Sequence, residues 1–124
     1  MSYITTWEEN GVYRKFSGQI SGEEILASNI EMHNHPLFLD IRYVINDFID
    51  ITGHSITPSH TSVYAKTDEI ISASVGRIKI ALVASEEYEP IANSYIEQMS
   101  DKTFKCKLFR TTLDAREWVI GLSI

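Results

Sequence analysis

The residues IRYVINDF, which run from Ile41 to Phe48, carry the strongest structural signal in this chain. In an extended segment successive side chains point to opposite faces, so Ile41, Tyr43 and Ile45 share one face and Val44 and Phe48 share the other. Apolar side chains on both faces are typical of a strand that is covered on both sides. We therefore expect this segment to form a central strand of a sheet.

Four other segments also have strand patterns. Residues 78–84 are apolar on both faces and predict a second central strand. Residues 3–7 and 12–16 are short runs of aromatic and β-branched side chains, and Asn10-Gly11 between them suits a hairpin turn because both residues tolerate positive φ. Residues 104–108 alternate apolar side chains with lysines, which predicts an edge strand with one solvated face.

A first helix is expected over residues 21–34. Ser21 and Glu24 have the spacing of a capping box, in which each of the two side chains binds a backbone N–H at the start of the helix. Asn34 and Pro36 mark its end, because proline cannot continue a helix.

Three further helices follow from capping signals and helical periodicity. Thr57-Pro58 and Gly76 mark the start and the stop of one helix. Another covers residues 86–101, where a looser turn capped by Ser85 precedes a regular helix that begins near Glu89. The last starts at Thr111 or Thr112 and buries four apolar side chains, which are Ala115, Trp118, Val119 and Leu122.

The order of these elements predicts one α/β domain over residues 1–124. Strands that are separated by helices pair in parallel, whereas the first two strands are joined by a short turn and pair in antiparallel fashion. We expect a mixed five-stranded sheet, with an N-terminal antiparallel hairpin and parallel pairing elsewhere, covered by about four helices.

Composition places the chain among globular proteins. Its 124 residues include 11 basic and 17 acidic side chains, a formal net charge of −6, and 44% are hydrophobic. This balance argues against a nucleic-acid surface, which needs clustered Lys and Arg, and no apolar run reaches the roughly 18 residues of a membrane span. The single cysteine, Cys106, excludes an internal disulfide and is expected to be a buried, unreactive thiol. We expect a cytoplasmic protein that uses no cofactor.

The sequence has no motif of a common catalytic class. Glycine-rich dinucleotide and phosphate loops, the nucleophile elbow and the zinc helix are all missing from it. His33 and His35 flank Asn34, but residues two apart on a helix point in nearly opposite directions, so this pair does not predict a metal site. We therefore name no catalytic residue and no metal ligand.

Two regions are candidates for binding a ligand or partner. On the helix over 21–34, Asn29 and His33 fall within the apolar arc, so they either hydrogen-bond neighbouring backbone or line a cavity. Asn46, Asp47 and Asp50 are expected at the carboxyl end of the central strand, which is the rim where open parallel sheets usually bind ligands.

The segment that follows, residues 49–60, is expected to be a long loop rich in Ser, Thr and His. We take it as the surface that contacts a protein partner or a small apolar ligand. The alternative is a small metal-dependent or acid–base hydrolase in which Asp47, Asp50, His54 and His60 converge.

Several strings in the chain resemble SpoIIAA-like proteins, which share the STAS fold of bacterial anti-sigma-factor antagonists. The similar segments are residues 12–18, 21–27, 43–48, 78–85 and FRTTLDAREWV at 109–119. The resemblance implies a non-catalytic regulatory or binding module of a bacterial cytoplasm. Anti-sigma antagonists accept phosphate within an Asp-Ser-Ser-Gly string, and the similar string here, Asp50-Ile51-Thr52-Gly53, implies Thr52 as the phospho-acceptor. Similarity of the wider family to lipid-transfer proteins also implies an apolar cavity.

The N-terminal hairpin is our candidate for a homodimer surface. It is expected to expose the aromatic side chains of Tyr3, Trp7 and Tyr13. Exposed aromatic clusters are frequent at protein–protein interfaces.

Overall fold

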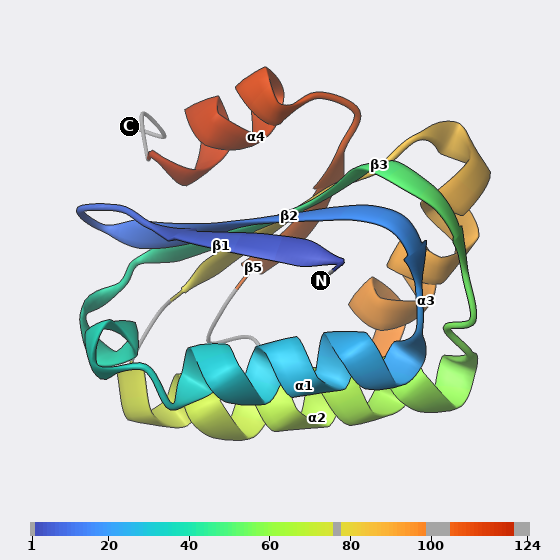
Figure 1. The fold of residues 1–124 in the computed structure, drawn as a ribbon. Helices are drawn as coiled ribbons and strands as arrows, with labels where there is room; N and C mark the ends of the chain where they lie inside the picture. The colour runs from blue at the N-terminus through green and yellow to red at the C-terminus, as the bar shows by residue number, and fades with distance from the viewer. Residues whose placement is uncertain (1, 76–77, 99–104, 121–124) are drawn as a thin grey trace.

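The computed structural model describes residues 2–75, 78–98 and 105–120. Within these residues the chain forms one mixed sheet with the strand order β1-β2-β3-β4-β5 (Figure 1). The strands are β1 (Tyr3–Trp7), β2 (Gly11–Ile20), β3 (Tyr43–His54), β4 (Lys79–Val83) and β5 (Lys105–Phe109). Strands β1 and β2 pair in antiparallel fashion and all other pairs are parallel. The predicted sheet is confirmed, and β3 is its central strand.

Helices cover both faces of this sheet. They are α1 (Gly22–His33), α2 (Pro58–Val75), α3 (Glu89–Gln98) and α4 (Thr112–Val119), with short 3₁₀ helices η1 (Pro36–Asp40) and η2 (Glu86–Tyr88). Figure 1 shows α1 and α2 lying side by side across one face and α4 across the other. Helix α3 packs against α2 on the same side as α1. The domain thus has three layers.

The two faces of β3 contribute to two separate cores, as its sequence pattern predicts, except that Ile41 precedes the strand and packs into the larger core. Val44 and Phe48 belong to the larger core, under α1, α2 and α3. Tyr43 and Ile45 belong to the smaller core, under α4. Because Ile45 is fully buried and Val44 is 3% exposed, both faces of the strand are excluded from water.

Strands β2 and β3 are longer than their apolar patterns indicate. Strand β2 continues to Ile20, and β3 continues to His54, because the two pair with each other over this whole length. The added part has two register shifts, and between them Gly18 adopts φ of +71°, a conformation that favours glycine. The backbone pairing in this part runs from Ser17 and Asp50 to Ile20 and His54.

The predicted hairpin is present, but its connection does not use positive φ at Asn10 or Gly11. In the described residues only Gly18 has positive φ, so the connection between β1 and β2 is not a tight mirror-image turn. Trp7 is paired with Val12, and the backbone N–H of Glu8 donates to the carbonyl of Gly11 at 2.8 Å. Gly11 is needed for space: a Cβ there would lie 2.3 Å from the ring of Tyr43.

The predicted helix starts agree with the structure. Ser21 and Glu24 form the complete capping box of α1, and the hydroxyl of Thr111 caps α4. Helix α3 begins at Glu89 after the short turn η2, although Ser85 makes no side-chain capping bond. Helix α2 begins at Pro58, as expected. The predicted stop at Gly76, the end of the helix over 86–101, Phe104 and the burial of Leu122 lie outside the described residues.

Candidate functional site

The polar residues expected at the carboxyl end of the central strand lie before that end, although the neighbouring strand β4 does end opposite Asp47. Because β3 runs on to His54, Asn46, Asp47 and Asp50 lie within the strand rather than at its end. Most of the predicted loop over 49–60 is likewise regular structure, since only residues 55–57 separate β3 from α2. The predicted strand ended at Phe48 because Asp50, Thr52 and His54 interrupt the apolar pattern after it, although Ile51 still packs into the larger core.

The three residues that were expected at the rim lie in three different surroundings. Asp47 lies on the α4 side, where its carboxylate accepts hydrogen bonds from the hydroxyls of Tyr13 and Thr112. Asp50 forms an ion pair with Lys15 at 2.9 Å on an exposed surface. Asn46 is on the opposite face from Asp47, 8% exposed, beneath α1, α2 and α3.

The four residues of the hydrolase alternative each have their own partners. Asp47 and Asp50 have those just described. The Nδ1 atom of His54 accepts from the backbone N–H of Ile56 at 3.0 Å, and His60 contacts Thr57 and Glu23. Within the described part of the chain, no group of three or more His, Cys, Asp or Glu side chains is arranged to hold a metal ion. The geometry gives this alternative no support.

A pocket lies between the sheet and the three helices of its larger core. It has a volume of about 70 Å³, and apolar side chains form most of its wall. The lining side chains come from β2, β3, β4, η2 and the three helices: Arg14, Ile25, Asn29, Asn46, Phe48, Ile51, Ile56, Thr61, Tyr64, Asp68, Leu82, Ala84, Tyr88, Ile91, Ala92 and Tyr95. We call this space the central pocket.

Arg14 supplies a buried positive charge to the wall of the central pocket. Its side chain is 3% exposed, and its partners are neutral: Nε donates to Oδ1 of Asn46 at 2.9 Å, and Nη1 donates to Oγ of Ser28 at 3.0 Å. The guanidinium also lies over the ring of Phe16, 5.4 Å from its centroid. Burial lowers the pKa of Arg14 to about 10, an effect that the negative charge of Asp68 partly opposes. At neutral pH the group remains charged.

Asn29 lines the same pocket with its hydrogen-bonding capacity unused. It is 4% exposed, and its amide has no hydrogen-bond partner among the described residues. Every fully occluded side-chain nitrogen or oxygen in that part of the chain does have a partner. The amide of Asn29 must therefore border open space, and the pocket is the space beside it. The sequence prediction that Asn29 faces the core side agrees with this burial.

His33 faces the core side too, but it contributes to a smaller neighbouring cavity of about 20 Å³. Its Nε2 atom lies 3.2 Å from Oδ1 of Asp68, and Oδ2 of Asp68 accepts a hydrogen bond from the hydroxyl of Tyr95. Burial, reinforced by Asp68, raises the pKa of Tyr95 well above its ordinary value. Arg14, Asn46 and Asp68 line both cavities, so they lie at the boundary between the two.

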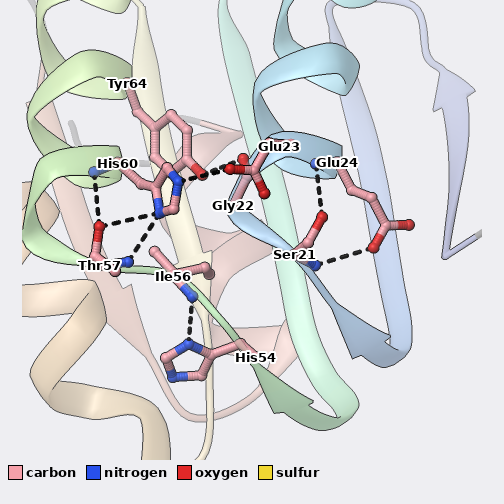
Figure 2. A network of polar contacts seen from close by, with 9 residues as sticks. All are labelled: Ser21, Gly22, Glu23, Glu24, His54, Ile56, Thr57, His60 and Tyr64. Atoms are coloured by element: carbon pink, nitrogen blue, oxygen red, sulfur yellow. Dashed lines mark hydrogen bonds and ion pairs between the residues drawn. The ribbon is translucent and has the colours of Figure 1, made fainter.

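A polar network holds α1 against α2 at one end of the pocket (Figure 2). The hydroxyl of Tyr64 donates to the carbonyl of Gly22 at 2.6 Å, and Nε2 of His60 lies 3.2 Å from a carboxylate oxygen of Glu23. On the other side of the ring, Nδ1 of His60 accepts from the backbone N–H of Thr57 at 3.0 Å. A backbone N–H that binds Nδ1 places the ring proton on Nε2, where it is donated to Glu23.

Sequence reasoning missed Arg14, Asp68 and Tyr95. A signal for Arg14 was present, because it alternates in β2 with Val12 and Phe16, which are both inward-facing. Asp68 and Tyr95 lie on two different helices, and only the packing of α2 against α3 brings their side chains together.

The other predicted positions are found as follows. Thr52 is exposed and lies within β3, six residues before α2 begins, so it is not at the start of a helix. Its phosphorylation stays a prediction. Cys106 packs against the larger core, and burial raises the pKa of its thiol.

The aromatic residues of the N-terminal hairpin contact their own chain. Tyr3 packs against Phe16, Trp7 stacks on His35, and Tyr13 hydrogen-bonds the carboxylate of Asp47. The homodimer therefore stays a prediction that these contacts do not support.

The fold and the pocket together define a small three-layer α/β domain with a mostly apolar pocket between its sheet and one helical layer. No helix within the described ranges is both long and apolar enough to cross a membrane.

Comparison with known proteins assigns the fold. No family model matches the chain, and no curated protein matches it in sequence. A solved structure that is similar is an uncharacterised protein of the DUF3478 family with a SpoIIAA-like fold, from Shewanella loihica PV-4. The two share 15% sequence identity over 94% of this chain and 91% of that chain, with a TM-score of 0.52. The SpoIIAA-like fold predicted from the sequence is thus confirmed.

Proposed function

We propose that this protein is a non-catalytic binding module that holds a small, mostly apolar ligand in the central pocket. The observation that carries the proposal is the amide of Asn29, which has no partner among the residues that the structure describes, is 4% exposed and borders this pocket. A buried amide without a partner costs about 1–3 kcal/mol, so natural proteins seldom keep one without a use for it. A ligand with a polar end would satisfy the amide.

The character of the wall supports an apolar ligand. Phe48, Ile51, Ile56 and Leu82 face the space, and the polar groups of the lining are few. Pockets for small molecules commonly combine an apolar wall with a few placed polar groups. The volume of about 70 Å³ is well below the roughly 300–1,000 Å³ of pockets for drug-sized ligands, so the ligand is a small one.

The lining also indicates where the ligand enters. Ile56, Tyr88 and Ile91 are half-buried, while the residues of the opposite end, such as Arg14 and Asn29, are almost completely buried. These half-buried side chains come from the carboxyl-terminal side of β3 and from the segment after β4. The ligand therefore enters past them, with its polar end directed inward.

The test is a titration with straight-chain alcohols from 1-butanol to 1-octanol, followed by ¹H–¹⁵N correlation spectra of the protein. We expect saturable shifts that are largest for residues lining the pocket. Ala92 lines the pocket and Ala27 is exposed on α1, so Ala92→Leu is expected to abolish the shifts and Ala27→Leu to leave them unchanged. If no alcohol of the series produced saturable shifts in the unmodified protein, the proposal would be wrong.

A role for protein partners is a separate prediction, and it now concerns the exposed end of β3 around Thr52 rather than a loop. Phosphorylation at this position would add about two negative charges beside Asp50 and Lys15. Intact-mass analysis of the protein from its native cells tests it. An added phosphate that maps to Thr52 supports the regulatory prediction, and unmodified protein under all growth conditions contradicts it.

A further inference from the structure

The charge of Arg14 has no direct counter-ion in the described part of the chain. Its two hydrogen-bonded partners, Asn46 and Ser28, are neutral. Among the described residues, no carboxylate lies within 4.0 Å of the guanidinium nitrogens. A buried charge is normally paired, because desolvating it without a partner is costly. The guanidinium is therefore a strong candidate to receive an anionic group.

The hydrogen-bond donors beside Arg14 point to the same conclusion. Nη2 of Arg14 and Nδ2 of Asn46 have no hydrogen-bond partner within the described ranges, and neither does the amide of Asn29. Since every fully occluded polar side-chain atom there is satisfied, these atoms border open space. All three residues line the central pocket, and Arg14 and Asn46 also line the smaller cavity. They present donors, including one with a full positive charge, and donors require an acceptor.

Among the charges that raise the pKa of Arg14, that of Asp68 has the largest effect. Both carboxylate oxygens of Asp68 already have partners. They interact with His33 and with the hydroxyl of Tyr95. These contacts join Asp68 to α1 and α3. Asp68 would favour a ligand with an ammonium group, and this alternative is included in the test below.

We propose that the ligand of the central pocket is a small aliphatic carboxylate whose carboxylate oxygens accept hydrogen bonds from Arg14, Asn29 and Asn46. This inference rests on the proposed function and adds the chemical class of the ligand. A planar guanidinium suits a carboxylate because two parallel N–H donors match its two oxygens. The aliphatic tail extends along Phe48 and Ile51 towards the half-buried mouth at Ile56 and Tyr88.

The experiment compares three probes with the same six-carbon chain and different heads: hexanoate, 1-hexanol and hexylammonium, each titrated at pH 7 and followed by ¹H–¹⁵N spectra. A hydrogen bond between two charged groups inside a pocket adds favourable free energy of binding. We therefore expect hexanoate to bind at least about tenfold more tightly than 1-hexanol. Hexylammonium is expected to bind more weakly than either.

Two variants assign the preference to the proposed groups. Arg14→Met removes the charge while keeping an apolar chain, and it is expected to make hexanoate bind no better than 1-hexanol. Lys15→Met is the matched control: Lys15 is the next residue of β2, pairs with Asp50 and does not line the pocket, so the preference should persist. Asn29→Leu is expected to weaken hexanoate binding while stabilising the protein, because it removes a buried amide that has no partner in the described structure.

The outcomes separate the two proposals. If 1-hexanol binds in the pocket and hexanoate binds equally or less tightly, the carboxylate inference is wrong and the apolar pocket stands. If hexylammonium binds more tightly than hexanoate, the carboxylate inference is wrong and a cationic ligand at Asp68 is favoured. A hexanoate preference that survives Arg14→Met would also overturn the carboxylate inference. If neither hexanoate nor 1-hexanol binds, the proposed function itself fails.

Discussion

Arg14 and Asn46 are direct register partners on adjacent parallel strands, and their side chains are joined by a hydrogen bond of 2.9 Å within the larger core. Both side chains thus lie on the face of the sheet that α1, α2 and α3 cover. The asparagine carbonyl orients the guanidinium without neutralising it. This leaves a fixed charge at the inner end of an apolar pocket.

The first prediction concerns this pair. Asn46→Leu removes the acceptor of a buried charged donor and should lower the free energy of unfolding by about 1–3 kcal/mol. Arg14→Met removes the unpaired charge itself and should leave stability unchanged or raised. In the Arg14→Met background, Asn46→Leu should change the free energy of unfolding only a little. Urea denaturation of the four proteins measures these values. An equal cost of Asn46→Leu in both backgrounds would show that Asn46 acts through other contacts.

The second prediction concerns the contact between Gly22 and His60. A Cβ at Gly22 would lie 2.3 Å from Nδ1 of the His60 ring. Gly22→Ala should therefore displace the ring, break its contacts with Thr57 and Glu23, and destabilise the protein (Figure 2). In a His60→Ala background the clash is gone, and Gly22→Ala should stabilise by about 0.5–1 kcal/mol because alanine favours the helix. Urea midpoints test this change of sign, and destabilisation in both backgrounds would contradict it.

The third prediction concerns the pH dependence of stability. Arg116 on α4 binds both carboxylate oxygens of Glu8, at 3.0 and 2.7 Å, and this contact is the main reason that the pKa of Glu8 lies below its ordinary value of 4.5. A carboxylate with a depressed pKa in the folded state contributes stability above its unfolded pKa and loses it as pH falls through the folded pKa. Glu8→Gln should therefore reduce the loss of stability below about pH 4.5. Its exposed neighbour provides the control Glu9→Gln, which should leave the loss unchanged. The free energy of unfolding of each variant, measured with denaturant at roughly half-unit steps from about pH 3 to about pH 7, checks both expectations.

The fourth prediction concerns Cys106. Burial raises the pKa of its thiol, with a further contribution from the charge of Asp68, so the reactive thiolate is scarce in the folded protein. At pH 8 we expect the native thiol to react with an aromatic disulfide reagent at least about a hundredfold more slowly than the thiol of the urea-unfolded chain. Similar rates in the two states would show that β5 leaves the sulfur accessible.

Local patterns were sufficient to predict most of the architecture. The two-faced apolar alternation of β3 identified the central strand, and the Ser21–Glu24 spacing identified the start of α1. These signals are local because strand alternation and helix capping depend on residues within a few positions of one another. Local logic also predicted the hairpin at Asn10-Gly11, but not the reason for its glycine, which leaves space for the ring of Tyr43, a residue far away in the chain.

The binding site depended on contacts that no local pattern contains. The sequence marked Asn29 and Asn46 as polar residues of a helix and a strand, but it contained no information that both would border one pocket with Arg14. The full length of β3 depended on β2, whose backbone groups pair with the polar half of the strand. A pocket is the space left between elements that pack together, so its shape and its charges are set by distances between parts of the chain that are remote in sequence.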